Sequence, residues 1–324
     1  MNKKVTIILY HYVRDLKNSK YPGIKGLDID LFKEQVTYLK KKYTIITMEQ
    51  LIDSIDNNTA LPAKSALLTF DDAYIDHFTQ VFPILIRNKI QGSFYAPVKA
   101  VKEHKVLDVN KIHHILASGV GNSKIICEIY NLLNHYREEF KLESNEYLYA
   151  KFAIADRFDT ADTIFIKRLL QKGLDEQLRK VIINKIFEKY IGICESDFAR
   201  ELYMSLDQIK TMMQFGMHFG SHGYDHYWLG NSPKRIQEIE IDKSLEFLKL
   251  IGVNLDQWTM SYPYGSYNMD TVNIINNKGC KLALTTKVNI ANLNQNTKFE
   301  LPRLDTNDIP TMANASTNSW YDQA

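Results

Sequence analysis

The alternation of strand-like and helix-like segments predicts an α/β fold built on a parallel sheet. Four short apolar runs in the first hundred residues are typical of strands: 5–12, 44–46, 65–70 and 92–97. Helical patterns separate them, and this rhythm indicates a parallel sheet with helices outside it, open or closed into a barrel. The rhythm stops after residue 100 and returns after residue 200. We therefore expect one α/β domain, formed by 1–100 and 201–324, with an insertion between its halves.

Local signals place the helices of the first half. Asp30 can cap a helix whose apolar residues recur at helical spacing up to Tyr43. Thr47 and Gln50 form a capping box, in which each side chain bonds the backbone of the other residue, and so predict a second helix. A third helix is expected over 75–87.

The insertion, 101–200, is predicted to be α-helical. It is rich in Lys, Glu, Leu and Ile, and it contains no proline and no clear strand pattern. After it, a capping box of Ser205 and Gln208 starts a helix and the alternation resumes. Strands are expected over 217–221, 258–262, 281–285 and 299–304, helices over 233–250 and 269–277, and a polar loop over 305–324.

Composition argues against several classes of function. The 40 basic and 38 acidic residues leave a net charge of +2, which gives no electrostatic footprint for nucleic acid or an anionic membrane. The three cysteines, Cys127, Cys194 and Cys280, form no CxxC pair, which argues against a zinc ribbon or a disulfide framework. No apolar stretch approaches the roughly 20 residues of a membrane span. The apolar run after Lys3 and Lys4 is short and lacks a small-residue cleavage site, so we expect a cytoplasmic protein.

Two adjacent carboxylates end the strand predicted over 65–70. Asp71 and Asp72 stand at its carboxyl end, where α/β folds place their functional sites. Neighbouring residues of an extended strand point to opposite faces, so both carboxylates can serve one site only if the backbone turns there. The competing interpretation is that one of them only caps the following helix.

Two histidines follow the strand predicted over 217–221. His222 and His226 are four residues apart, which lets both imidazoles meet one ion, and Gly223 allows the chain to turn between them. A carboxylate from another strand end would complete a three-ligand set with one open position, as in catalytic zinc sites. Each histidine alone could equally be a satisfied core or surface residue.

These clusters resemble the first two motifs of the polysaccharide deacetylases, the NodB-homology carbohydrate esterases. The matching segments are Thr69–Asp72 and Ser221–His226, in the order of the family. Tyr262–Gly265 looks like the third motif, Leu301–Arg303 resembles a late motif, and Tyr10–Val13 is similar to the first strand of members that act on surface glycans. The resemblance does not cover the helical insertion.

The resemblance implies a fold, a mechanism and a cofactor. The fold would be a distorted (β/α) barrel with fewer than eight strand–helix units. Asp72, His222 and His226 would bind a divalent metal, with zinc favoured and cobalt, nickel, manganese or iron chemically possible. Asp71 would act as the general base toward the attacking water, and the backbone N–H of Tyr264 would help to hold the oxyanion of the tetrahedral intermediate.

Two residues of the family pattern are missing. Met260 and Ser261 stand where the third motif often begins with an arginine that orients the base. Arg303 is the candidate substitute, because the last strand should end beside the first; a structural salt bridge is its alternative role. The late histidine of many members, which protonates the leaving amine, is also missing, since no histidine follows His226.

Two other histidines are candidates for that acid. His11 ends the first predicted strand and is expected to line the site, with its role open. His113 borders the apolar face of a predicted helix in the insertion and could reach the site as acid or extra ligand, whereas His114 is expected to face solvent. The alternative for His113 is a packing role. Aromatic residues beside the motifs, such as Tyr74 and Trp228, are expected to pack.

The predicted reaction is metal-dependent hydrolysis of an N-acetyl group on an amino sugar, which releases acetate and a free amine. A cytoplasmic location favours a surface-glycan precursor: an N-acetylated sugar nucleotide, a lipid-linked sugar or a short oligosaccharide. The insertion would form a lid or one wall of the substrate groove. Two alternatives stay open: an amidohydrolase that acts on a small non-sugar amide, and a non-catalytic glycan-binding protein on the same barrel. Nothing in the sequence specifies an oligomeric state.

Overall fold

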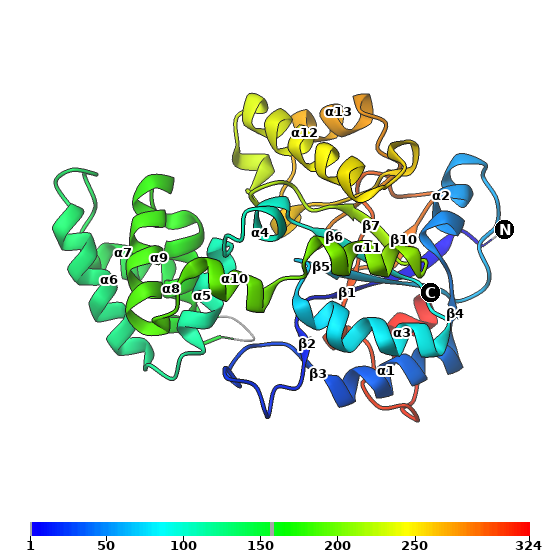
Figure 1. Ribbon diagram of the computed structural model, residues 1–324, viewed down its shortest axis with the longest axis horizontal. Helices are drawn as coiled ribbons and strands as arrows, with labels where there is room; N and C mark the ends of the chain where they lie inside the picture. Colours follow the sequence, from blue (N-terminus) through cyan, green and yellow to red (C-terminus); the bar gives the residue numbers. More distant parts are fainter. Residues whose placement is uncertain (1, 156–158) are drawn as a thin grey trace. The chain divides into compact units, whose positions relative to one another are not determined.

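The computed structural model describes residues 2–155 and 159–324, which form two compact units. The first comprises the residues up to Asp15, Gly26–Lys105 and Ala199–Ala324. The second comprises Leu16–Lys25 and Val106–Phe198. Every strand assigned in the described residues belongs to the first unit (Figure 1).

A sheet of nine strands, most of them parallel, forms the centre of the first unit, so the predicted α/β fold is confirmed. Its main path runs β10-β1-β5-β6-β7-β8-β9, with β4 paired to β5 and β11 paired to β1. The strands are β1 (Lys4–Tyr10), β4 (Thr44–Ile45), β5 (Ser65–Asp71), β6 (Gly92–Ala96), β7 (His218–Ser221), β8 (Met260–Ser261), β9 (Ala283–Leu284), β10 (Ala291–Asn292) and β11 (Leu304–Asp305). A separate parallel pair consists of β2 (Val13–Arg14) and β3 (Leu27–Asp28).

The central strands are covered on both faces. Every residue of β5 is buried, and so is every residue of β1 after Lys4, which is why their sequences are continuous apolar runs without alternation. The parallel register pairs Tyr10 with Phe70 and Asp71 with Tyr95, so the carboxyl ends of β1, β5 and β6 lie at the same edge of the sheet. The residues that follow these strands are therefore neighbours in space.

One segment near the C-terminus joins the two ends of the sheet. Leu301 forms a parallel bridge with Leu284 of β9, and β11, which begins at Leu304, pairs in parallel with β1. The pairing therefore continues from β9 through this segment to β1, which gives the distorted (β/α) barrel that was predicted. Arg303 lies between the two pairings.

Helices pack outside the strands. In Figure 1, α12 and α13 lie on one side of the strands and α1 and α3 on the other. The helices of this unit are α1 (Ile29–Lys42), α2 (Met48–Asp56), the π-helix η1 (His77–Val81), α3 (Phe82–Asn88), α4 (Val98–Lys102), α11 (Leu206–Gln214), α12 (Lys234–Ile251), α13 (Met269–Asn277), α14 (Ser319–Gln323) and the 3₁₀ turns η3 (Leu229–Asn231), η4 (Leu255–Gln257), η5 (Pro263–Gly265) and η6 (Thr306–Asp308).

Side-chain caps set where several helices begin. The two predicted capping boxes, at Thr47 and at Ser205, are both present. The prediction that Asp30 caps α1 is wrong, because Asp28 is the extended residue before the helix and its carboxylate accepts the N–H of Asp30 at 3.0 Å. Asp30 lies inside the first turn.

Two further predictions of local structure are wrong in part. The segment 75–87 is not one α-helix, because the π-helix η1 precedes α3; Pro83, at the start of α3, has no N–H with which to continue the ladder of hydrogen bonds. The segment 305–324 is not all loop, because it contains η6 and α14. Asn318 caps α14, and Trp320 packs against the core of the first unit.

The second unit is helical in all of its described elements. They are α5 (Asp108–Leu116), α6 (Asn122–Tyr136), α7 (Asn145–Phe152), α8 (Ala161–Arg168), the π-helix η2 (Leu169–Gly173), α9 (Glu176–Ile191) and the start of α10 (Glu195–Leu202). Ile129, Leu133, Phe165 and Ile182 are completely buried in it. Across both units, none of the described helices has the length and apolarity needed to cross a bilayer.

We expect Ser205→Ala to lower the free energy of unfolding by about 1 kcal/mol, because it removes the hydroxyl that accepts the N–H of Gln208 at the start of α11. All three tryptophans, Trp228, Trp258 and Trp320, belong to the first unit, so urea unfolding followed by tryptophan fluorescence reports on it. Ser205→Thr keeps the hydroxyl and is the control. Equal stability of the alanine variant would contradict a stabilising role for this cap.

Candidate metal centre

The chain turns sharply at the end of β5, directly after Asp71. Asp72 and Ala73 both have left-handed backbone conformations, with φ of 74° and 53°. This turn is the condition that allows two adjacent carboxylates to serve one site, because it breaks the alternation of an extended strand. Both carboxylates are buried, with residue exposures of 2% for Asp71 and 4% for Asp72.

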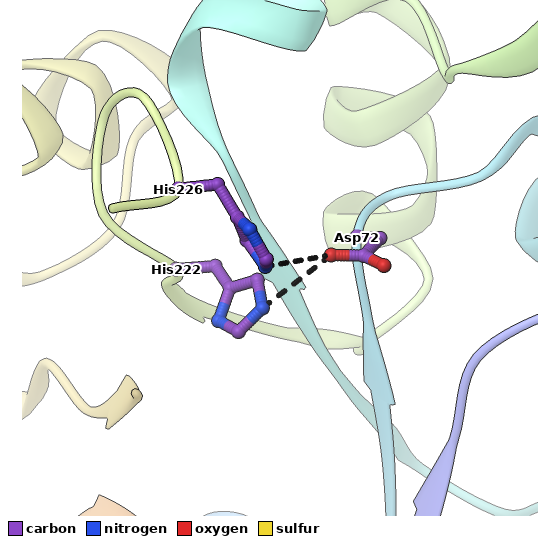
Figure 2. Close-up of side chains that lie close together, drawn as sticks. All are labelled: Asp72, His222 and His226. Carbon is purple, nitrogen blue, oxygen red and sulfur yellow. Dashed lines mark ion pairs between the residues drawn. The ribbon is translucent and has the colours of Figure 1, made fainter. Parts of the chain in front are cut away.

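Asp72 faces the two histidines that follow β7. Its Oδ1 atom lies 3.4 Å from Nε2 of His222 and 3.4 Å from Nε2 of His226, as Figure 2 shows. The three potential ligand atoms all lie within 4.8 Å of one another, and all three residues are buried. The predicted metal-binding residues are thus brought together by the ends of two strands that are far apart in the sequence.

Neighbouring groups orient each of these side chains. Nδ1 of His222 donates to the carbonyl oxygen of Ser261 at 2.7 Å, which leaves Nε2 as the atom that can bind a cation. The hydroxyl of Tyr74 donates to Oδ2 of Asp72 at 2.6 Å, which turns Oδ1 toward the histidines. The ring of His226 packs edge-on against Tyr264, with the ring centroids 4.5 Å apart.

The electrostatics of this group favour positive charge between the three side chains. Oδ1 of Asp72 receives no hydrogen bond from any described residue, and a buried carboxylate oxygen without a partner is costly. Burial lowers the pKa of His226 to about 3, which favours the neutral imidazole that binds metals. Burial also acts to lower the pKa of His222, but the nearby carboxylates Asp71 and Asp72 raise it overall. The group thus offers one oxygen and two nitrogen donors, and the negative charge of the oxygen is not compensated. Such a donor set fits a divalent cation.

Arg303 binds both carboxylate oxygens of Asp71. Nη1 of Arg303 donates to Oδ1 of Asp71 at 3.0 Å and Nη2 donates to Oδ2 at 2.8 Å, while the Ser261 hydroxyl donates to Oδ2 at 2.9 Å. Burial acts to raise the pKa of Asp71, but the charge and hydrogen bonds of Arg303 hold that pKa at about 2. Asp71 is therefore an ionised carboxylate at neutral pH, and Oδ1, which accepts one of these bonds, keeps a lone pair available.

Arg303 satisfies all five of its N–H groups at this place. Besides the two bonds to Asp71, Nε donates to the carbonyl of Thr285 at 2.9 Å, Nη1 donates to the hydroxyl of Thr69 at 3.2 Å and Nη2 donates to the hydroxyl of Ser261 at 2.9 Å. The residue is 1% exposed. The structure thus places Arg303 and Ser261 together on Asp71, with Arg303 supplying the guanidinium that the third motif lacks.

Tyr264 lies on the turn that follows β8. It occupies the second position of η5 in a left-handed conformation, with φ of 57°. Its ring lies between His226 and Trp228, and it stacks on Trp228 at a centroid distance of 4.2 Å. The residue proposed as an oxyanion donor is therefore beside the predicted ligands.

The remaining predicted histidines lie in different units. His11 follows β1, is exposed, and accepts a hydrogen bond from Nε2 of His77 on its carbonyl oxygen at 2.8 Å. Tyr10, the last residue of β1, pairs with Phe70 of β5, so His11 follows at the same edge of the sheet as Asp71. His113 lines a cavity of about 160 Å³ within the helical unit; the other lining residues are Gly23, Lys25, Leu116, Asn122, Asp159, Thr163 and Lys167.

The prediction that His114 faces solvent is wrong. It is 1% exposed, and its Nδ1 lies 2.8 Å from the carbonyl oxygen of Asn110. Its ring meets Tyr21 and Phe198 edge-on, at centroid distances of 5.1 and 4.8 Å. The apolar face of α5 is wider than the sequence pattern indicated, because aromatic partners from distant segments cover the histidine.

Two contributors to the site were not predicted. Tyr74 packs against Tyr12, as an aromatic residue beside a motif was expected to do, but its hydroxyl also holds Asp72. Ser261 was noted only as standing near the position of the missing arginine, yet its carbonyl and hydroxyl orient His222 and Asp71. A small polar residue at the end of a strand was the only signal for Ser261.

Comparison with known structures shows the same fold in deacetylases. The Streptococcus pyogenes deacetylase PplD, solved in complex with acetate, is 18% identical with a TM-score of 0.57, over 97% of this chain and 95% of that chain. IcaB from Ammonifex degensii is 19% identical with a TM-score of 0.57, over 95% and 94%. A de-N-acetylase from Aggregatibacter actinomycetemcomitans is 14% identical with a TM-score of 0.53, over 99% of each chain. No curated protein sequence matches the chain.

The sequence also matches a family model directly. Residues 182–283 match the model described as Polysaccharide deacetylase. The matched region contains His222, His226 and Tyr264, and Asp71 and Asp72 lie outside it. The chain is thus similar to the polysaccharide deacetylases in sequence over residues 182–283, and in fold over nearly its whole length.

Proposed function

We propose that this protein is a divalent-metal-dependent deacetylase that removes the N-acetyl group of an amino sugar as acetate. One observation carries the proposal: a buried carboxylate and two buried imidazoles converge, and the adjacent carboxylate is fixed by a buried arginine. A merely structural cluster would need no second ionised carboxylate beside the first. The family match supports the same reaction.

Asp72, His222 and His226 would hold the cation. Their one oxygen and two nitrogen donors suit zinc, and cobalt, nickel, manganese and iron are alternatives. A bound divalent cation would supply Lewis acidity, which polarises the acetyl carbonyl and lowers the pKa of water.

The other residues would act on the proton and the oxyanion. Asp71 would accept the proton of the attacking water at Oδ1, because that oxygen keeps a lone pair while Arg303 fixes the plane of the carboxylate. The backbone N–H of Tyr264 would stabilise the oxyanion. His11, exposed at the edge where the strands end, and His113 stay the candidates for the acid that protonates the leaving amine.

A sugar is the substrate class that the surroundings favour. Tyr264 and Trp228, two half-buried residues beside His226, stack on one another, and the outer face of such a pair would suit a sugar ring better than a small amide. The names of two similar structures, a deacetylase solved with acetate and a de-N-acetylase, are consistent with N-acetyl hydrolysis. We propose a surface-glycan precursor, either an N-acetylated sugar nucleotide, a lipid-linked sugar or a short oligosaccharide. The cytoplasmic location stays a prediction.

Removal of metal should abolish the activity. We expect the purified protein to contain about one divalent ion, and dialysis against a chelator to stop acetate release until zinc or cobalt is added back. Acetate released from N-acetylated sugar nucleotides and oligosaccharides, compared with N-acetylated amines that are not sugars, is the measurement. Turnover that survives complete metal removal would contradict the proposal. Turnover of the non-sugar amines alone would favour the small-amide alternative.

Asp71→Asn should lower kcat by about 10²- to 10⁴-fold and leave the metal content unchanged, because it removes the proton acceptor but none of the ligands. Asp270→Asn, at an exposed position on α13, is the matched control. Equal acetate release by the Asp71 variant would rule out Asp71 as the base. Complete loss of metal from that variant would mean that Asp71 belongs to the ligand set.

Arg303→Lys should lower kcat by about 10²-fold with little change in KM, because one ammonium group cannot fix both oxygens of Asp71. Arg87→Lys, at an exposed position on α3, is the control. Steady-state kinetics together with thermal unfolding separate misplacement of the base from loss of the fold. An unchanged kcat would assign Arg303 a structural role only.

A further inference from the structure

The turn between the two histidines is bound by one buried carboxylate. Glu240, on α12, is 3% exposed. Its Oε2 accepts the backbone N–H of Tyr224 at 3.0 Å and that of Asp225 at 2.8 Å. These two peptide groups lie between His222 and His226 in the sequence, so Glu240 contacts the connection between two of the three predicted ligands.

The carbonyl groups of the same turn are bound from the opposite direction. The N–H of Lys99 donates to the carbonyl of Tyr224 at 2.9 Å, and the N–H of Val98 donates to the carbonyl of Gly223 at 3.3 Å. The carboxylate of Asp225 pairs with Nζ of Lys99 at 2.5 Å, which ties the turn to α4 through a side chain as well. The N–H groups of the turn therefore donate to Glu240, and its carbonyl groups accept hydrogen bonds from the start of α4. These bonds leave the turn little freedom to shift.

The burial of Glu240 has no other explanation in the described structure. It forms no ion pair with any described residue, because Lys99 is taken by Asp225 and Lys243 lies over the ring of Tyr224. Burial raises the pKa of Glu240 to about 7, so placing an acid here has a cost that an apolar residue would avoid. What the carboxylate gains in return is the pair of hydrogen bonds to the turn.

The turn contains two left-handed residues, of which only His226 is strained, because glycine adopts a positive φ freely. Gly223 and His226 both have left-handed conformations, with φ of 72° and 57°. A Cβ atom on Gly223 would lie 3.3 Å from Oε2 of Glu240, so the carboxylate approaches the backbone closely. A left-handed histidine persists only where neighbouring groups impose it, and Glu240 binds the N–H groups of the two residues that precede His226.

We propose that Glu240 is a positioning residue of the metal centre, which fixes the turn 223–225 and thereby sets the separation of the His222 and His226 imidazoles. The inference rests on the proposed function, since it assigns a residue that supports the same site. Residues that orient metal ligands typically change metal affinity by about 10- to 100-fold when they are removed. Glu240 touches neither the cation site nor the ligand side chains in any described contact, so it would act only through the backbone.

The test is the dissociation constant for Co²⁺, measured by titration calorimetry at pH 8 on the full chain. Glu240→Met keeps the approximate volume but removes the acceptor, and we expect it to raise the dissociation constant about 10- to 100-fold. Glu240→Gln keeps a carbonyl oxygen that can accept both N–H groups, and we expect its affinity to stay close to that of the wild type. Glu246→Met, at an exposed position on the same helix, is the matched control.

Circular dichroism of the metal-free proteins shows whether each variant folds. If Glu240→Met does not fold, Glu240→Asp is tested instead. Its side chain is one methylene group shorter, so the carboxylate no longer reaches the N–H groups of the turn, and Co²⁺ binding should still be weaker. Wild-type affinity in a folded Glu240→Met, or in Glu240→Asp where that variant is needed, would overturn the inference and leave the proposed function intact. A wild-type protein that binds no Co²⁺ would overturn both. A wild type that binds Co²⁺ but releases no acetate would overturn the proposed function alone.

Discussion

The burial of two adjacent negative charges at the end of β5 is the constraint on which the rest of the site depends. A buried carboxylate must be compensated, and the two are compensated in different ways. Asp71 is paired with the guanidinium of Arg303, whereas Asp72 has a tyrosine hydroxyl on one oxygen and two imidazole nitrogens near the other. The charge of Asp71 is thus compensated within the chain, whereas Asp72 retains negative charge that a cation can neutralise.

Closure of the barrel is what brings Arg303 to Asp71. Leu301 pairs with β9 and Leu304 pairs with β1, so the residues between them connect the two strands at which the barrel closes. β1 is the direct neighbour of β5, which carries Asp71. The guanidinium of Arg303 binds Asp71 from this segment, and the hydroxyl of Ser261, at the end of β8, contacts both of them.

The sequence predicts those parts of the site in which a local sequence pattern also contains the side chains that the chemistry needs. The strand rhythm and two capping boxes locate the elements, and the spacing of His222 and His226 points to a shared ion. Arg303 could be predicted as a partner of Asp71 because the last strand of a parallel barrel must lie near its first strand. Tyr74, Ser261 and His114 were missed or misplaced, because their roles depend on which distant side chain arrives beside them. No local pattern distinguishes a tyrosine that only packs from one whose hydroxyl also reaches a carboxylate two residues away.

Three residues of the proposed site have a left-handed backbone conformation, which is costly for residues other than glycine. Asp72, His226 and Tyr264 all have positive φ, at 74°, 57° and 57°, although none of them is glycine. Each such conformation costs about 1–2 kcal/mol, and glycine would remove that cost. Glycine could not supply the carboxylate of Asp72 or the imidazole of His226, so the strain persists where the side chain is required. Of the three, only Asp72 follows its strand directly, whereas His226 and Tyr264 lie within the turns after β7 and β8.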